Sequence, residues 1–173
     1  MKEEYLMLRE EILHLDSLVN NTINFFYVFI ATYNAFALLQ DDTIFILLSY
    51  IVIIPAYLIV LNKMQAMCKI GAYLKVFHEG EQFLWETRLM EYKKKYENSR
   101  FRVVSWHFPF ILVSLAISVL FLYRFEWDGG FSYYEISKIV ICFSGNCFVF
   151  LQVSKYKNIT SKDYIKKWED IIS

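Results

Sequence analysis

The stretch Ile44–Leu61, IFILLSYIVIIPAYLIVL, decides the fold class of this chain. It holds no charged residue over 18 positions. The hydrocarbon core of a bilayer is about 30 Å thick, and a helix that rises about 1.5 Å per residue needs roughly 20 apolar residues to cross it. A run of this length and composition therefore predicts a membrane-spanning helix.

Three more runs of the same kind follow the same pattern, namely Ile23–Leu39, Val103–Tyr123 and Ile136–Val153. Hydrophobic residues make up 57% of the chain, above the roughly 45–50% of soluble domains. We therefore expect an all-α, polytopic membrane protein with four transmembrane helices. Its expected segments are an amphipathic helix over 1–20, a transmembrane hairpin over 21–62, a cytoplasmic helical hairpin over 63–102, a second transmembrane hairpin over 103–153 and an amphipathic tail helix over 154–173.

The basic residues are divided unequally between the two sides of these runs. Of 18 Lys and Arg residues, 16 lie in the two ends of the chain and in the 63–102 segment, and only Arg124 and Lys138 lie on the other side. Short loops rich in Lys and Arg stay in the cytoplasm. We therefore expect a membrane protein with both termini cytoplasmic, and with the loops Gln40–Thr43 and Arg124–Glu135 outside.

The segments expected in the cytoplasm carry amphipathic patterns. Apolar residues recur along Glu3–Val19 at helical spacing, and the opposite face is acidic, which favours packing against another helix over a position on the membrane surface. Gly80 is expected to separate the two arms of the 63–102 hairpin. Lysines near the inner leaflet are candidates for lipid headgroup contacts, although a plain solvated face also explains the first three: Lys93, Lys94, Lys95, Lys166 and Lys167.

Polar residues inside the apolar runs fall into stripes when about 100° is allowed per residue. The candidate stripe residues are Asn34, His107, Ser114, Ser118 and Asn146. Such stripes either pack helices together or line a water-filled path, and we favour packing because Ser and small residues are common at helix contacts. Lys138 lies close enough to the outer end to reach the headgroups as an anchor.

The sequence offers little that indicates chemistry. The three histidines lack metal-ligand spacing, no nucleophile elbow or phosphate-binding glycine loop is present, and no acidic residue lies deep in any run. We therefore expect no enzyme, no cofactor, no metal site and no contact with nucleic acid.

The layout resembles the small multi-spanning membrane proteins of prokaryotic antiviral defence loci, namely SLATT-like proteins and the four-helix membrane subunit of the Kiwa system. The resemblance lies in the charged helix Glu3–Val19, the following NNTINFFYVFI of Asn20–Ile30, and the cytoplasmic arms Lys63–Asn98. It implies a homo-oligomeric effector or sensor of the bacterial inner (plasma) membrane, which receives a signal from a soluble cytoplasmic partner and acts on the lipid bilayer around it. The alternatives are a non-conducting membrane scaffold for a cytoplasmic partner and a small channel or transporter subunit.

Overall fold

The computed structural model describes residues 2–78, 88, 91, 106–125, 132–156 and 162–172. Of these residues 91% are helical and none forms a strand, which confirms the all-α prediction. The second arm of the expected 63–102 hairpin, with Lys93, Lys94 and Lys95, lies outside the described residues; Arg88 and Glu91, which are described, are helical.

The first helix, α1, runs from Lys2 to Ala37 without a break. The sequence suggests an amphipathic helix followed by a separate membrane run, but the polar residues 20–22 between them stay helical. Asn20 helps here, because its side-chain amide bonds to Asp16 one turn earlier at 3.4 Å. Glu3 and Glu4 in the first turn suit the positive end of the helix dipole.

The run Ile44–Leu61 begins as a short helix, α2 (Ile44–Leu47), and continues as α3 (Tyr50–His78). The sequence favours Asp42 or Thr43 as the residue that caps this run. Asp42 does so, since its carboxylate accepts the backbone N–H of Ile44 at 2.9 Å. Thr43 makes no side-chain capping bond.

The second half of the chain forms α5 (Phe108–Arg124), α6 (Tyr133–Tyr156) and α7 (Lys162–Ile172). Pro109 stands in the first turn of α5, where a missing N–H costs no intrahelical bond. A reciprocal capping box starts α6: Glu135 N–H donates to Ser132 Oγ at 3.3 Å, and Ser132 N–H donates to the Glu135 carboxylate at 3.1 Å.

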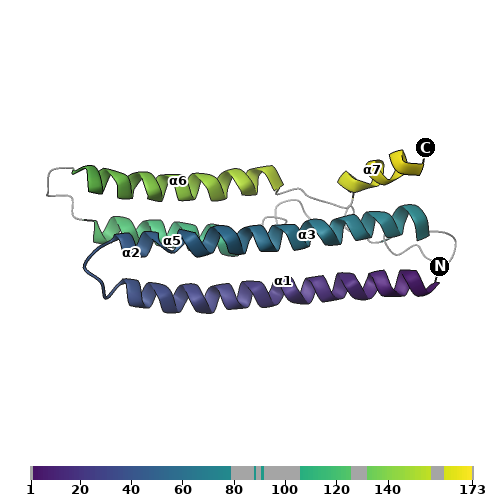
Figure 1. Ribbon diagram of the computed structural model, residues 1–173, viewed down its shortest axis with the longest axis horizontal. Coiled ribbons are helices and arrows are strands. Elements are labelled where there is room, and N and C mark those ends of the chain that lie inside the picture. Colours follow the sequence, from purple (N-terminus) through teal and green to yellow (C-terminus); the bar gives the residue numbers. More distant parts are fainter. Residues whose placement is uncertain are drawn as a thin grey trace. The chain divides into compact units, whose positions relative to one another are not determined.

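The chain divides into two compact units. We call the first the bundle unit (Thr22–Leu58 and Ser105–Lys157) and the second the terminal unit (Met1–Asn21, Ile59–Val104 and Asn158–Ser173). In the bundle unit α5 lies beside α6, and α2 contacts both (Figure 1). Phe26 of α1 packs on Phe110 of α5, with ring centroids 4.8 Å apart. Large side chains fill the centre of this unit: Ile46, Leu47, Ile53, Tyr57, Phe110, Ile117, Phe121 and Val149.

In the terminal unit the first turns of α1 contact the last turns of α3. Tyr73 donates its hydroxyl to Glu4 at 2.9 Å, and His78 Nε2 lies 3.4 Å from the same carboxylate. The sequence suggests that α7 lies on the inner leaflet, but Trp168 of α7 packs edge-on against the ring of Tyr73, with centroids 5.3 Å apart. Its indole N–H also donates to the carbonyl of Lys69 at 3.2 Å. Trp168 of α7 therefore packs against α3, whereas Ile171, on the same apolar face, is 70% exposed.

Two segments among the described residues are long and apolar enough to cross a membrane, namely Ile44–His78 and Tyr133–Tyr156. The sequence predicts four such helices, but α1 and α5 do not combine the length and the apolar composition that a membrane span requires. Helix α5 has 17 residues, or about 26 Å at the usual rise. Helix α1 is long, but its N-terminal half is charged and its apolar part ends at Ala37, two residues before the apolar run does.

Candidate functional site

A network of polar side chains joins three helices at the centre of the bundle unit. Ser114 Oγ of α5 donates to the side-chain oxygen of Asn146 of α6 at 2.9 Å, and the Asn146 amide donates to Ser118 Oγ at 2.6 Å. The hydroxyl of Tyr50, from α3, lies 3.3 Å from Ser118 Oγ. The structure thus brings together three of the five predicted stripe residues and adds a tyrosine that the sequence analysis does not single out.

Tyr50 also makes the closest helix contact of this network. Its ring lies against Gly145 of α6, where an added Cβ atom would come within 2.7 Å of the ring. That distance is far below ordinary van der Waals contact, so the close approach of α3 and α6 here requires glycine. Gly145 directly precedes the stripe residue Asn146, and because it has no side chain the Tyr50 ring can pack against the backbone of α6.

Asn34, the fourth stripe residue, lies apart from this network. Its side-chain oxygen accepts the hydroxyl of Ser49 at 3.3 Å, and its amide donates to the carbonyl of Ile30 one turn earlier at 2.9 Å. Both Asn34 and Ser49 are buried. The pair joins α1 to the junction between α2 and α3.

His107, the fifth stripe residue, lies just before α5 and pairs with α3. Its Nδ1 is 3.1 Å from the hydroxyl of Tyr57, and both side chains are buried. Trp106 stacks on the same tyrosine, with ring centroids 5.7 Å apart. Tyr50 and Tyr57 are seven residues apart on α3. They meet Ser114 of the antiparallel α5 and His107, which lies seven residues earlier, just before α5 begins.

These contacts explain what the polar stripes do in a single chain. Each candidate residue contacts a side chain from another segment of the bundle unit, and six of the residues involved are buried: Asn34, Ser49, Tyr50, Tyr57, His107 and Ser114. Hydrogen bonds between helices inside a membrane contribute about 0.6 kcal/mol each on average. The geometry therefore suits helix packing, which the sequence analysis favours over a water-filled path.

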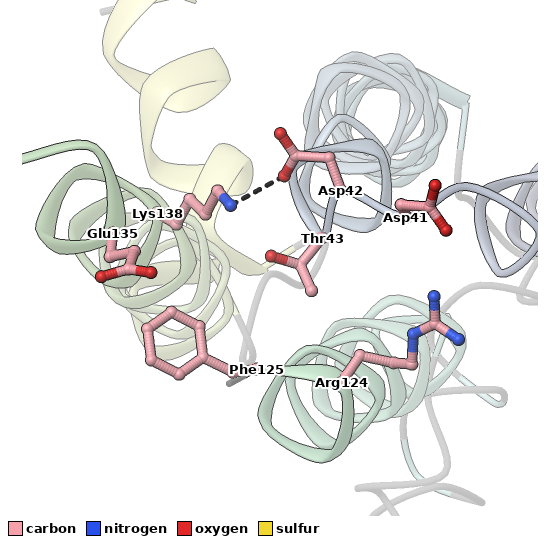
Figure 2. A pocket seen from close by; sticks show the side chains of 7 residues that line it. All are labelled: Asp41, Asp42, Thr43, Arg124, Phe125, Glu135 and Lys138. Carbon is pink, nitrogen blue, oxygen red and sulfur yellow. Dashed lines mark ion pairs between the residues drawn. The ribbon is translucent and has the colours of Figure 1, made fainter. Parts of the chain in front are cut away.

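A second polar cluster lies at the end of the bundle unit that carries the link 40–43. Lys138 Nζ lies 2.7 Å from the carboxylate of Asp42 (Figure 2). Tyr134 donates its hydroxyl to the same carboxylate. Partial burial of Asp42 raises its pKa, but the hydrogen bonds from Lys138, Tyr134 and one backbone amide outweigh it and hold the pKa below the ordinary value of 3.8. Asp42 therefore ties the first hairpin to α6 as a carboxylate.

The expectation that Lys138 reaches the lipid headgroups is not met, because its side chain is buried and 8% exposed. Coulomb attraction to Asp42 and the face of Tyr134, 4.3 Å from Nζ, hold it inward. Arg124, the other basic residue expected outside, donates to the carbonyl of Gln40 at 2.9 Å. An open hollow of about 280 Å³ lies among these groups, lined by Asp41, Asp42, Thr43, Arg124, Phe125, Glu135 and Lys138 (Figure 2).

The remaining candidates concern the lipid headgroups. Lys166 and Lys167 are exposed on α7, and Lys167 Nζ lies 5.2 Å from the ring of Tyr164. Over the ranges that the structure describes, no group of three His, Cys, Asp or Glu residues is arranged to hold a metal ion. Comparison with protein families, with characterised proteins and with solved structures found no match for this chain.

The sequence analysis identified the stripe residues but not the side chains to which they bond, namely Ser49, Tyr50 and Tyr57. Ser49, Tyr50 and Tyr57 interrupt an apolar run, and their spacing puts Tyr50 and Tyr57 on one face of α3. Two tyrosines seven residues apart within an apolar run could have indicated a helix face that contacts polar groups of other helices. A tyrosine in the middle of such a run needs a partner for its hydroxyl.

Proposed function

We propose that this chain is an integral membrane protein with four spans, and that it is the membrane subunit of a signalling or effector system with a soluble partner. The observation that supports the membrane assignment is the distribution of side chains in the bundle unit. Beside its apolar core, this unit buries six polar or charged residues and exposes many large apolar ones, which is a partial reversal of the pattern in soluble proteins. The buried polar residues are Asn34, Thr43, Ser49, His107, Ser114 and Lys138.

Helix α5 illustrates the distribution best. Its buried side includes Ser114, whereas its exposed side is apolar apart from Tyr123 at the end. In water such a surface would drive aggregation. In lipid it is the expected surface, so we include α5 among the spans although it is short. The exposed large residues of α5 are Phe108, Leu112, Leu115, Val119, Leu122 and Tyr123.

The same reversal appears on the part of α1 that belongs to the bundle unit. Phe25, Val28 and Phe29 are exposed, while Asn34 is buried and bonded. Two residues after the end of α1 extend the apolar stretch to Leu39, which is 81% exposed. These features support a span over 23–39, with the helix covering most of it.

The cluster around Asp42 supports the predicted orientation. Arg124 contacts Gln40, and Lys138 contacts Asp42, so the link 40–43 lies at the same end of the bundle unit as the end of α5 and the start of α6. The other 16 basic residues belong to the opposite sides of the four runs. The positive-inside rule then favours both termini in the cytoplasm.

The polar pairs favour a subunit that does not conduct ions by itself. A water-filled path needs polar groups that face water, whereas Ser114, Ser118 and Asn146 bond to one another. We therefore favour a role in which the spans anchor the terminal unit at the inner leaflet for a soluble partner. Perturbation of the membrane, which the defence resemblance implies, would then require an oligomer or a triggered rearrangement.

Reporter fusions test the topology. A reporter active only in the cytoplasm is fused after Ser173 and inserted separately between Asp41 and Asp42, and membranes are washed with alkaline carbonate to identify integral protein. We expect activity from the first fusion, none from the second, and full retention in the membrane. Activity from both positions would leave the first hairpin outside the bilayer and overturn the four-span proposal.

A permeability assay tests the conduction question. Cells expressing the chain are followed by dye uptake and membrane potential, with Asn34→Leu and Asn146→Leu as variants and Cys147→Leu as a control on the exposed side of α6. We expect no permeabilisation by the unstimulated protein. Constitutive dye uptake that only the two asparagine variants abolish would instead favour a pore lined by the stripes.

A further inference from the structure

A buried hydroxyl without a partner lies in the hollow at the end of the bundle unit. Thr43 lines this hollow and is only 7% exposed. It makes no side-chain capping bond, and no other group in the described ranges bonds to its hydroxyl. In Figure 2 the Thr43 oxygen points toward the side of the hollow where α6 carries Glu135 and Lys138. Because buried hydroxyls are normally hydrogen-bonded, this one indicates that the hollow receives a ligand.

The two cations at the hollow already have acceptors. Arg124 donates to the carbonyl of Gln40 at 2.9 Å, and Lys138 Nζ lies 2.7 Å from the carboxylate of Asp42. The Lys138–Asp42 contact is the one ion pair drawn among the lining side chains (Figure 2). An anionic ligand would therefore have to replace existing contacts before it gained its own.

Two carboxylates at the hollow, in contrast, have no cationic partner in the part of the chain that the structure describes. They belong to Asp41, which is exposed, and to Glu135. Glu135 accepts the N–H of Ser132 with its Oε2 atom, so its Oε1 atom can accept from a ligand. The lining holds three carboxylates against two cations. The remaining negative charge favours a ligand with a single positive charge.

A primary ammonium group matches these acceptors better than a metal ion does. Calcium takes about six to eight oxygen ligands that converge on it, and within the described ranges no three acidic, His or Cys side chains converge in this way. An ammonium group needs acceptors for three N–H donors, and Glu135 and the Thr43 hydroxyl supply two. The ring of Phe125 forms one wall of the hollow (Figure 2), and cations are attracted to aromatic faces.

The neighbouring segment of the chain cannot supply this positive charge. Residues 126–131, which lie outside the described residues, read EWDGGF and include two acidic residues and no Lys or Arg. Apart from Arg124 and Lys138, the basic residues belong to the two ends of the chain and to the 63–102 segment, on the other side of the apolar runs. The cation must therefore come from a separate molecule.

Exposed tyrosines near the hollow suit the depth of lipid headgroups. Tyr123, beside Arg124, and Tyr133, at the start of α6, are both almost fully exposed. Tyrosine is enriched where the apolar core of a membrane meets the headgroups. A lipid whose headgroup ends in a primary ammonium group is therefore one source of the ligand, and a small soluble amine is the other.

We propose that the hollow binds a primary ammonium group, which donates to Glu135 and to the Thr43 hydroxyl and is carried by an ethanolamine phospholipid or by a small soluble amine. The lipid source rests on the proposed function, because it requires this end of the bundle unit to lie at a membrane surface. The ammonium chemistry itself does not depend on that function.

Calorimetric titration of the full chain in a nonionic detergent tests the chemistry. The probes are ethanolamine and choline in amine-free buffer. Both carry one positive charge and a hydroxyl group, but choline has no N–H donor. We expect saturable binding of ethanolamine and at least tenfold weaker binding of choline, because the charge-assisted hydrogen bonds are lost. Equal affinities, or no saturable binding of ethanolamine, would overturn the proposal.

Four variants locate the binding. Glu135→Gln keeps the capping box of α6 and should weaken ethanolamine about tenfold, because it removes a charged acceptor. Thr43→Val should weaken it about fivefold, because a neutral acceptor is lost, whereas Thr43→Ser keeps the hydroxyl and should bind normally. Glu10→Gln removes an exposed carboxylate of α1 and is the control. Circular dichroism checks that each variant is helical. Unchanged affinity in folded Glu135→Gln would overturn the proposal even where Thr43→Val does not fold.

Native mass spectrometry distinguishes the two sources. The chain is released from nanodiscs that contain equal amounts of phosphatidylethanolamine, phosphatidylcholine and phosphatidylglycerol. We expect phosphatidylethanolamine to be retained in excess, and to be lost in Glu135→Gln and on addition of ethanolamine. Ethanolamine binding without this excess would keep the ammonium site and assign it to a soluble amine. Reporter activity from the insertion between Asp41 and Asp42 would refute the proposed topology without changing the calorimetric result.

Discussion

The ring of Tyr50 occupies the space that a side chain at Gly145 would need, with its atoms 2.7 to 2.8 Å from the position of an added Cβ. This close approach of α3 and α6 is possible only because residue 145 has no side chain, so that the Tyr50 ring can lie against the backbone of α6. The first prediction concerns this contact.

Replacement Gly145→Ala should destabilise the protein by about 1–3 kcal/mol, the usual cost of overpacking a well-filled core. The free energy of unfolding in detergent, followed by circular dichroism, measures it. Ser144→Ala, at an exposed neighbour on α6, is the control and should have little effect. Because the clash is with one ring, Tyr50→Leu combined with Gly145→Ala should cost less than the sum of the two single changes.

Asn146 is the second test, since it both accepts from Ser114 and donates to Ser118. Asn146→Leu should lower the free energy of unfolding by about 1–2 kcal/mol, near the upper end for hydrogen bonds between membrane helices. Cys147→Leu adds similar bulk at an exposed position and should be close to neutral. Equal effects of the two leucines would mean that the network contributes nothing measurable.

The Tyr57–His107 pair is the third. Tyr57→Phe removes one hydroxyl from a 3.1 Å contact without changing the ring, so it should cost about 1 kcal/mol. Tyr123→Phe removes a hydroxyl at a position that is 84% exposed and should cost nothing. Stability of the two phenylalanine variants in the same detergent decides between a hydrogen bond and simple stacking.

Acid should weaken the cluster around Asp42. Its pKa in the folded protein is lower than the ordinary 3.8, so the stabilisation is complete above the ordinary value and is lost as pH falls below it toward the folded value. Thermal unfolding between neutral pH and pH 3 should show this loss for the natural sequence. Asp42→Asn should flatten that part of the profile, whereas Glu135→Gln, at the hollow but without the Lys138 contact, should not.

Removal of one partner of the Lys138–Asp42 pair should cost more than removal of both. Asp42→Asn leaves a cation that is only 8% exposed, and an unpaired buried charge is strongly destabilising. The double variant Asp42→Asn, Lys138→Met should therefore be more stable than Asp42→Asn alone. The opposite order in chemical unfolding would show that Lys138 finds water or another partner.

Helical periodicity made part of this structure predictable. The spacing placed Ser114 and Ser118 on one face of their helix and predicted Asn146 as a stripe residue of another helix. In the structure these residues face one another. The identity of the fourth member, Tyr50, could not be predicted, because it depends on which face of α3 meets the two helices. That rotation follows from packing between residues that are far apart in sequence.

The sequence placed Arg124 and Lys138 on the same side of the apolar runs, but it did not predict the contacts that these two side chains make. Arg124 and Lys138 were expected outside, and they do lie at one end of the bundle unit with the link 40–43. Lys138 was expected to extend toward lipid, since a single run contains no information on a carboxylate in another hairpin. The number of spans shows the same limit, because α5 begins only at Phe108, the sixth position of the predicted run Val103–Tyr123.

The two cations of the outer loops have a consequence for anything that approaches from that side. Arg124 donates to a carbonyl of the link and Lys138 pairs with the Asp42 carboxylate, so both cations already have partners within the bundle unit. A phosphate, nucleotide or acidic peptide that binds there would have to compete with the Arg124–Gln40 and Lys138–Asp42 contacts. In the proposed topology, recognition of such molecules would be left to the cytoplasmic side, to which the other 16 lysines and arginines are assigned.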